Sequence, residues 1–361
     1  RLRRYAVPPG AVAGQDRMEG MALRSAIKGY GRIGRCFLRA LLASPARGHF
    51  EVVAINEPAD LESMAYLTRF DSTHGCFPGT VEVGPGSLCI DGRTIRVFHA
   101  DTPEGVAWGE LGVDVLVEAS GRYSHRPDLE RFLAAGCRRV LLSHPGQTAE
   151  DVDQTIVFGM NHELLTGMER IVSAASCTTN AIVPVLSILD EAFGLEHAML
   201  TTLHSVMNDQ PLIDGYHHSD LHRTRSAMQS MIPVSTGLAR GVQRLLPELA
   251  GRIESKAIRV PVVNVSAIDL VATLGRGTTA AEVKALLRRA AEGGGAGRMM
   301  YTDHPHASID FNHSPHSAIV DGGQTRLSGD RLLNLLVWFD NEWGFANRMI
   351  DVVDFWGRRM A

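Results

Sequence analysis

The stretch Gly29-Tyr30-Gly31-Arg32-Ile33-Gly34 decides the fold, because it lies between a short strand-like run from Ala22 and a helical run over 35–43. This is the G-x-G-x-x-G pattern in the strand, turn and helix setting that a dinucleotide-binding site needs. The glycines permit a tight turn and let a pyrophosphate approach the helix N-terminus, where backbone N–H groups and the helix dipole favour anions. The pattern predicts an α/β fold with a Rossmann-type, doubly wound domain.

Glu57 follows a second predicted strand, Glu51 to Asn56, and stands about 20 residues beyond the glycines. An acidic side chain at this place accepts hydrogen bonds from both ribose hydroxyls and repels a 2′-phosphate, which predicts NAD as the cofactor and not NADP. The alternative is that Glu57 is a carboxylate at a helix start, since Glu57-Pro58 opens the next helical stretch.

Further strand candidates alternate with helical or loop segments such as 126–135 and predict a mostly parallel sheet. They lie at 113–118, 139–143, 155–159 and 170–173. Segment 70–98, rich in glycine and β-forming residues, is expected to be an antiparallel excursion. Ligands of this fold bind at the carboxyl ends of the strands, so we expect Ser120 near the dinucleotide.

Cys177 stands in Ser176-Cys177-Thr178-Thr179-Asn180, between a β-rich run over 170–175 and an apolar helical run over 181–193. A cysteine on the first turn of a helix lies at the positive end of the dipole, which favours the thiolate and predicts a nucleophile. The alternative is a buried structural cysteine, but the polar neighbours supply caps and oxyanion donors that packing does not need. We expect Pro184 in the first turn of this helix, where proline is tolerated.

The second half of the chain is expected to be an α+β domain with a mostly antiparallel sheet. Strand 199–203 leads to His204, and the polar loop 205–232 has the length of a functional or intersubunit loop. Helices are expected at 236–245, 280–291 and 341–355, and strands at 255–265, 267–274, 308–311, 317–320 and 333–339. We therefore expect a disordered extension over 1–20, an NAD-binding domain over 21–176 completed by 341–361, and a catalytic domain over 177–340.

Composition narrows the possible functions. The net charge of −4 gives no sign of a nucleic-acid footprint, and five cysteines without a C-x-x-C pair indicate neither a disulfide framework nor a metal site. No apolar stretch approaches the roughly 20 residues of a membrane span. We expect a soluble protein of the reducing cytoplasm, with no metal, no nucleic-acid partner and no membrane partner.

Three motifs carry a resemblance to a known family. Segments 29–35, 175–180 and 338–344 resemble the glyceraldehyde-3-phosphate dehydrogenase superfamily. Within it, segments 143–146, 207–210, 310–317 and 344–349 are similar to the D-erythrose-4-phosphate dehydrogenase branch. Met207 stands where the glycolytic branch usually has a threonine. Two departures accompany the resemblance: Lys28 replaces the family's asparagine before the first glycine, and Thr236-Gly237 is closer to the glycolytic branch.

The resemblance implies roles for particular residues. His204, which could otherwise be a strand-end histidine bonded to backbone, would stabilise the Cys177 thiolate and act as acid and base. Asn341 would hold the nicotinamide carboxamide, and the backbone of Arg32 and Ile33 the pyrophosphate. Further cofactor contacts would come from Arg96 and Ser120. The substrate would contact Ser176, Thr178, Arg223, Thr236, Gly237 and Arg259, although Arg223 could instead form an intersubunit ion pair.

The implied reaction is oxidation of D-erythrose 4-phosphate by NAD. Cys177 would add to the aldehyde, and the thioester left after hydride transfer would be released by water as 4-phospho-D-erythronate. The resemblance also implies a homotetramer and a role in pyridoxine biosynthesis. One alternative is a phosphorylating glyceraldehyde-3-phosphate dehydrogenase, in which inorganic phosphate takes the acyl group; another is a non-catalytic NAD-binding protein.

Overall fold

The computed structural model describes residues 22–295 and 297–360, so the extension expected over residues 1–20 lies outside the described residues. By their internal contacts, the described residues form two compact units. The first unit comprises residues 22–176 and 346–360, and the second comprises residues 177–345.

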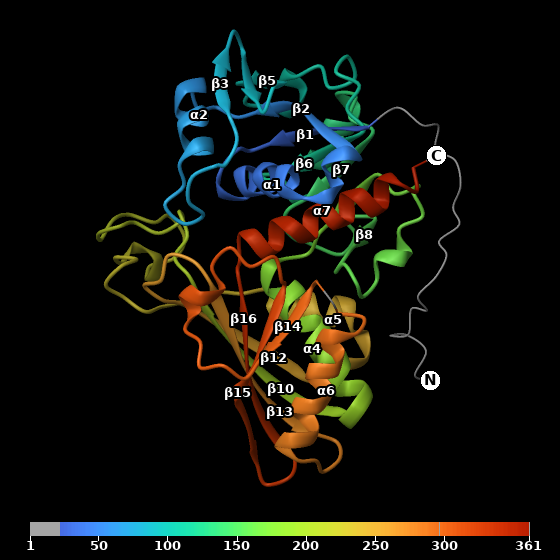
Figure 1. Cartoon of the computed structure of the whole chain (residues 1–361), viewed down its shortest axis with the longest axis vertical. Coiled ribbons are helices and arrows are strands. Elements are labelled where there is room, and N and C mark those ends of the chain that lie inside the picture. The colour runs from blue at the N-terminus through green and yellow to red at the C-terminus, as the bar shows by residue number, and fades with distance from the viewer. Residues whose placement is uncertain (1–21, 296, 361) are drawn as a thin grey trace. The chain divides into compact units, whose positions relative to one another are not determined.

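The first unit is built on a nine-stranded sheet of order β3-β4-β5-β2-β1-β6-β7-β9-β8 (Figure 1). Its strands are β1 Leu23–Lys28, β2 Phe50–Asn56, β3 Val81–Gly84, β4 Ser87–Ile90, β5 Arg93–Phe98, β6 Val115–Glu118, β7 Arg139–Leu142, β8 Gln154–Thr155 and β9 Ile171–Ser173. Its helices are α1 Arg32–Ala43, α2 Leu61–Arg69 and α3 Arg126–Ala134. Neighbouring strands from β5 to β8 pair in parallel, which confirms the predicted doubly wound sheet.

The second unit has a seven-stranded sheet of order β11-β12-β10-β13-β16-β15-β14. The strands are β10 Leu195–His204, β11 Ile232–Val234, β12 Ile253–Arg259, β13 Ser266–Leu274, β14 Met299–Thr302, β15 Ala318–Ser328 and β16 Leu332–Phe339. Helices α4 Cys177–Phe193, α5 Leu238–Leu245 and α6 Ala280–Glu292 lie along this sheet (Figure 1). Antiparallel pairs predominate, as predicted, but β10 with β12 and β14 with β15 pair in parallel.

The last helix, α7 Trp343–Gly357, begins in the second unit and belongs to the first unit from Ala346 onward. Asp340 caps it, because Oδ1 accepts the N–H groups of Glu342 at 2.9 Å and Trp343 at 2.8 Å. Within the first unit, Asp354 of α7 bonds Nδ1 of His49 at 2.8 Å. Short 3₁₀ helices are η1 Pro45–Gly48, η2 Pro103–Gly105, η3 His162–Leu164, η4 His222–Thr224, η5 Pro247–Leu249 and η6 Ser308–Phe311.

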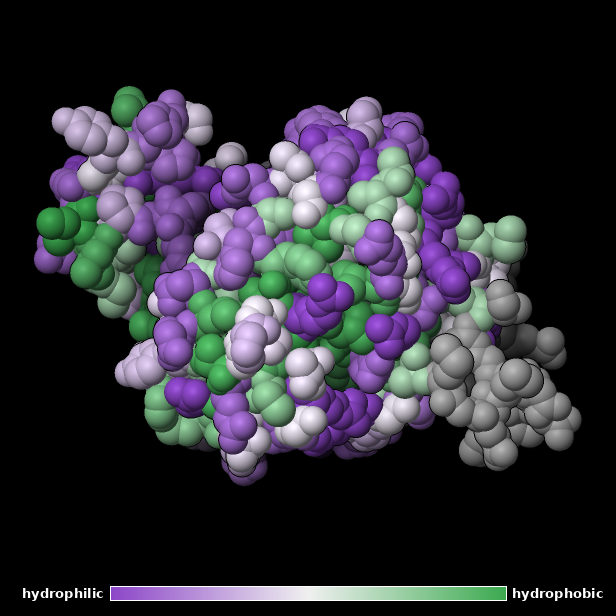
Figure 2. Space-filling view, turned by 90° about the horizontal axis from the view of Figure 1, so that it is seen from above, coloured by the Kyte–Doolittle hydropathy of each residue, from purple (hydrophilic) through white to green (hydrophobic). Residues whose placement is uncertain are grey.

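Among the described residues, no helix combines the length and the apolar character needed to cross a bilayer. On the face shown in Figure 2, hydrophilic and hydrophobic residues are intermixed.

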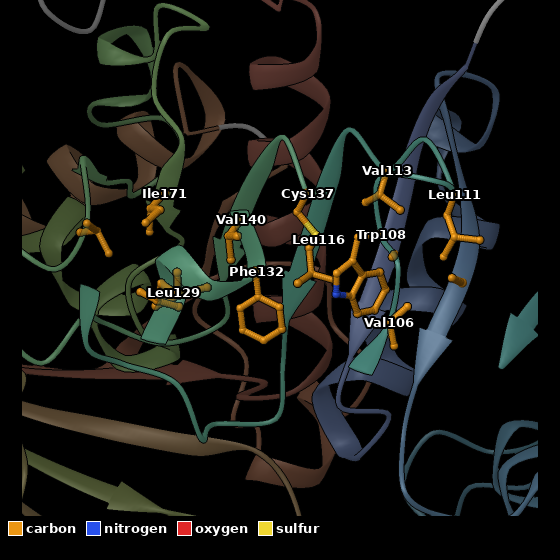
Figure 3. Close-up of a cluster of buried hydrophobic side chains, with 14 residues drawn as sticks. Val106, Trp108, Leu111, Val113, Leu116, Leu129, Phe132, Cys137, Val140 and Ile171 are labelled. Carbon is orange, nitrogen blue, oxygen red and sulfur yellow. The ribbon is translucent and has the colours of Figure 1, made fainter. Parts of the chain in front are cut away.

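One core cluster shows how the first unit holds its sheet together. Trp108, Leu116 and Phe132 are fully buried in it, from the loop before β6, from β6 and from α3 (Figure 3). The Trp108 indole donates to the Pro103 carbonyl at 3.0 Å, so burial leaves no polar atom of this ring unpaired. Burial of each such side chain contributes about 2 kcal/mol. This core keeps β6 and its carboxyl end in place.

Several local predictions were wrong. Pro184 lies inside α4 and not in its first turn, because the helix begins at Cys177; the apolar packing around it offsets the missing N–H. Segment 308–311 is the 3₁₀ helix η6 and not a strand, since the Asp310 carboxylate accepts the Ala307 N–H at 2.8 Å and favours a turn.

Other strand limits also differ from the prediction. Strand β12 ends at Arg259, two residues before Pro261, which has no N–H to continue a ladder. The strand predicted at 155–159 is reduced to β8, and β14 was missed. In segment 70–98, β3 and β4 are antiparallel as expected, while β5 joins β2 in parallel.

Candidate active site

The glycine turn between β1 and α1 is packed on one side and open on the other. Gly29 has φ +87°, and a Cβ there would overlap the backbone of Ser120. A Cβ at Gly34 would overlap the Gly29 carbonyl, so both positions need glycine for close approach. A Cβ at Gly31, the N-cap of α1, would meet nothing within 4 Å. The open space therefore lies at the helix N-terminus, where a pyrophosphate would bind.

Glu57 lies against this turn. Its Oε2 accepts the Tyr30 N–H at 2.6 Å. The helix-start alternative is wrong, because α2 begins at Leu61 and is capped by Asp60, whose Oδ1 accepts the Ser63 N–H at 2.8 Å. Glu57 is thus a carboxylate at the carboxyl end of β2, beside the glycine turn.

The other residues expected at the cofactor lie on α1, after β6 and on β5. Arg32 and Ile33 form the first turn of α1, and the Arg32 side chain is held away by Asp71, with Nη1 to Oδ2 at 2.6 Å. An anion at this helix end could therefore be bound by the backbone N–H groups of Arg32 and Ile33 and not by the Arg32 side chain. Ser120 follows β6 and donates its N–H to Oε1 of Glu118 at 2.9 Å. Arg96 lies before the carboxyl end of β5, with its guanidinium 5.2 Å from the Phe98 ring centroid.

In the second unit, Cys177 is the first residue of α4 and follows Ala175, which has φ +60°. A non-glycine residue in the left-handed region is strained and typical of functional turns. The Thr178 backbone N–H bonds the Cys177 sulfur, so one backbone donor lies at the reactive atom.

His204 and Arg259 end the parallel strands β10 and β12 as register partners. His204 Nδ1 lies 2.8 Å from the Ser205 carbonyl oxygen, an acceptor, and 3.0 Å from Arg259 Nη1, a donor. Either neutral tautomer of the imidazole is therefore supported. The Ser205 carbonyl supports the form that keeps Nε2 unprotonated, which a general base requires.

The same desolvation acts oppositely on the two reactive side chains. Cys177 keeps part of its surface exposed, yet the protein around it raises the pKa of the thiol to about 11, against the lowering effects of the Thr178 N–H and Arg259. Burial, and then the Arg259 charge, lower the pKa of His204 to about 4. Both groups are neutral near pH 7, whereas the sequence predicted a resting thiolate, because desolvation outweighs the helix terminus here.

Comparison with protein families gives two matches. Residues 23–126 match the family described as glyceraldehyde 3-phosphate dehydrogenase, NAD binding domain, and residues 176–341 match glyceraldehyde 3-phosphate dehydrogenase, C-terminal domain. The chain belongs to the glyceraldehyde-3-phosphate dehydrogenase family. The first unit therefore contains the family's NAD-binding domain, and NAD is the cofactor.

Arg259 lies beside His204, and Arg223 shares an acidic partner with Arg259. Asp209 Oδ2 lies 2.8 Å from Arg223 Nη1 and 3.9 Å from Arg259 Nη2, so one carboxylate partly neutralises both. The Nε of Arg259 is buried without a hydrogen-bond partner, and it is available to an anion. Thr236 and Gly237 precede α5, where Thr236 Oγ1 accepts the Leu238 N–H at 3.2 Å.

Asn341 is held by two serines that sequence reasoning did not find. Ser266 Oγ accepts the Ser205 N–H at 3.1 Å, so its own proton goes to Asn341 Oδ1 at 2.8 Å. Ser205 Oγ gives a second bond to the same oxygen at 3.0 Å. The two hydroxyls fix the orientation of the amide and leave its N–H₂ group to donate elsewhere. Asp209 was also missed, because only its distances to the arginines reveal it.

Proposed function

We propose that this family member oxidises D-erythrose 4-phosphate to 4-phospho-D-erythronate. Its membership in a family of NAD-dependent dehydrogenases supports the reaction type. The observation that carries the substrate assignment is Met207, three residues after His204, where a half-exposed thioether offers no donor to a phosphate. A four-carbon substrate places its phosphate one carbon further from the aldehyde, so that it can bind Arg259 without a hydroxyl at position 207.

The first chemical step uses Cys177 and His204. The sulfur adds to the aldehyde carbon, and its proton passes to Nε2 of His204 while Nδ1–H bonds the Ser205 carbonyl. An anionic substrate that engages Arg259 weakens the contact between Arg259 and Nδ1, which favours this protonated form. The Thr178 N–H stabilises the oxyanion until Nε2–H of His204 returns the proton to it, which leaves a neutral His204 and a thiohemiacetal on Cys177.

The second step converts the thiohemiacetal into a thioester. When bound, NAD accepts the hydride from the former aldehyde carbon. His204 takes the proton of the thiohemiacetal hydroxyl, and Asn341 orients the nicotinamide carboxamide through its N–H₂ group. His204 then releases this proton to solvent, takes a proton from the attacking water, and passes it to the Cys177 sulfur as 4-phospho-D-erythronate leaves.

The test is the initial rate of NADH formation with each aldehyde, with and without inorganic phosphate. We expect kcat/KM for erythrose 4-phosphate to exceed that for glyceraldehyde 3-phosphate by at least about tenfold, with no requirement for phosphate. A better rate with glyceraldehyde 3-phosphate that depends on phosphate would identify the phosphorylating reaction instead. Thr236-Gly237, which resembles the glycolytic branch, is the feature that favours this second candidate.

We also propose a cytoplasmic homotetramer. Segment 205–231 forms an irregular loop (Figure 1). Large apolar side chains of this loop are exposed. They are Leu212 at 72%, Ile213 at 73%, Tyr216 at 104%, Leu221 at 84% and Met231 at 76% exposed. Such a run of exposed apolar residues supports a buried contact between copies. Light scattering should give four times the chain mass; a monomer at micromolar concentration would exclude this assembly. We also propose a role in pyridoxine biosynthesis, because the chain resembles the D-erythrose-4-phosphate dehydrogenase branch.

A further inference from the structure

The segment Ser143-His144-Pro145-Gly146 has no part in the mechanism above, yet it directly follows the carboxyl end of β7. Nε2 of His144 lies 3.1 Å from Oε2 of Glu118, at the end of the neighbouring strand β6. The Glu118 side chain is fully buried, and 23% of the His144 side chain is exposed. A carboxylate so deeply buried needs a charged partner or several donors.

The surroundings of His144 determine its charge. Nδ1 lies 2.9 Å from the Pro145 carbonyl oxygen, and Nε2 faces the Glu118 carboxylate. Both partners accept hydrogen bonds, so the ring satisfies both only when each nitrogen carries a proton. Burial lowers the pKa of His144, but the bonds to Glu118 and to the Pro145 carbonyl outweigh burial and raise this pKa above its usual value.

Hydrogen bonds connect this pair to the glycine turn. The other oxygen of Glu118, Oε1, accepts both the N–H and the hydroxyl of Ser120. The Ser120 backbone is the surface against which Gly29 packs so closely that a Cβ would not fit. The orientation of Glu118 therefore fixes Ser120, and Ser120 in turn supports the turn that precedes α1.

A second connection runs in the opposite direction along the strand ends. The His144 carbonyl accepts the Ser173 hydroxyl at 2.8 Å, and Ser173 Oγ accepts the Ala175 N–H at 3.0 Å. Ala175 is the left-handed residue just before Ser176 and Cys177. His144 thus joins the ends of β6, β7 and β9.

The charged and polar groups around His144 and Glu118 come from the neighbouring strands. Glu118 is the charged group that acts on the imidazole, and β9 contributes the neutral hydroxyl of Ser173. Glu118 also acts electrostatically on Lys28 at the end of β1 and on Tyr123 after β6. Lys28 Nζ donates to the Ala100 carbonyl at 3.1 Å, so the lysine that replaces the family's asparagine is itself held in place.

We propose that His144 is a positioning residue of the NAD site, which holds Glu118, Ser120 and the glycine turn in their binding arrangement only while its imidazole is protonated. The proposal rests on the proposed placement of the cofactor against Ser120 and the turn. Loss of the proton leaves one of the two acceptors without a donor and removes the positive charge beside buried Glu118. Because NAD then binds the protonated form better, its affinity falls as the pH rises through the pKa of His144.

The experiment measures the Kd of the full-length protein for NAD by calorimetry from about pH 6 to about pH 9. The pKa values of Cys177, about 11, and His204, about 4, lie outside this range, so these groups do not titrate in it. We expect the wild-type Kd to rise about tenfold over the range. His144→Gln keeps an amide donor for Glu118 but cannot change charge, so its Kd should be nearly constant.

His49→Gln is the matched control, because His49 also pairs with a carboxylate of the first unit, Asp354, but at the surface. This variant should keep the wild-type pH dependence. A wild-type Kd that is constant with pH, or a His144→Gln variant that keeps the wild-type slope, would overturn the proposal. Failure of the wild type to bind NAD at about pH 6 would instead refute the cofactor assignment, and with it the proposal.

An independent readout is the NMR titration of the His144 ring. Bound NAD should raise the pKa of this ring further, because a ligand that prefers the protonated form stabilises it. A pKa that is the same with and without NAD would contradict the proposed linkage even if the variants bind poorly.

Discussion

His204 and Arg259 face each other at the carboxyl ends of two parallel strands, with His204 Nδ1 and Arg259 Nη1 3.0 Å apart. The guanidinium carries a fixed charge, so it disfavours the imidazolium and helps to keep His204 neutral at rest. An anion that binds Arg259 reduces this effect. In the mechanism proposed above, the two residues therefore link binding of the substrate anion at Arg259 to the basicity of His204.

Replacing Cys177 by serine should abolish NADH formation and leave the Kd for NAD nearly unchanged. A serine hydroxyl is a far weaker nucleophile than a thiolate, and Cys177 has no assigned contact with NAD. Steady-state assays and calorimetry on the same preparation test both statements. The assignment fails if the variant keeps more than a few per cent of the activity.

Replacing His204 by asparagine should slow the reaction by about 10² to 10⁴. It should also alter stability in acid. The pKa of buried His204 is lowered to about 4, so its neutral form contributes stability above its usual pKa, and this is lost as the pH falls towards about 4. The wild type should lose roughly 3 kcal/mol more than the variant over this window. Urea unfolding at several pH values measures the difference; parallel curves would contradict it.

Replacing Ser266 by alanine should raise KM for NAD about fivefold, because Asn341 loses one of the two donors that fix its amide. The value of kcat for the saturated enzyme should change less. Ser328→Ala, at an exposed serine of β15, is the control. An unchanged KM for NAD in Ser266→Ala would mean that Asn341 does not hold the cofactor through this orientation.

Two glycine variants should separate folding from binding. Gly29→Ala should lower Tm by several degrees, because φ +87° and overlap with Ser120 both oppose a side chain. Gly31→Ala should fold normally, since its Cβ meets open space, but should weaken NAD binding by filling that space. Thermal unfolding and calorimetry distinguish them. Equal NAD affinity of wild type and Gly31→Ala would place the pyrophosphate elsewhere.

Glu57→Gln tests the choice of cofactor. The wild type should have a much higher kcat/KM with NAD than with NADP, because a 2′-phosphate meets the like charge of Glu57. Removing that charge should reduce the preference by about tenfold. Equal use of both cofactors by the wild type would refute the role of Glu57.

The sequence predicted what depends on short-range patterns. The glycine turn, the strand ends that carry Glu57, Ser120 and His204, and the start of α4 at Cys177 follow from periodicity and from motifs a few residues long. It could not predict contacts between distant residues. Ser205 and Ser266 are 136 and 75 residues from Asn341, and no pattern in the sequence indicates that they meet it.

The balance of opposing energies was also outside the reach of the sequence. The helix terminus favours a Cys177 thiolate, and this was predictable, but the desolvation that overcomes it depends on packing around the sulfur. The predicted position of Pro184 was wrong for a related reason. Burial of the surrounding helix outweighs the free-energy cost of a proline ring inside it. Local rules gave the positions of these residues, and tertiary packing set their states.

The assignment of residues 346–360 to the first unit has a consequence for the order in which the protein can fold during synthesis. Residues 22–176 leave the ribosome before the second unit, but Met349, Val353 and Trp356, which are buried in the finished protein, are made only after it. The second unit, by contrast, is contiguous in the chain from residue 177 to residue 345. We expect the nascent second unit to become protease-resistant before the first, although the first is translated earlier, and arrested chains of increasing length would reveal this order.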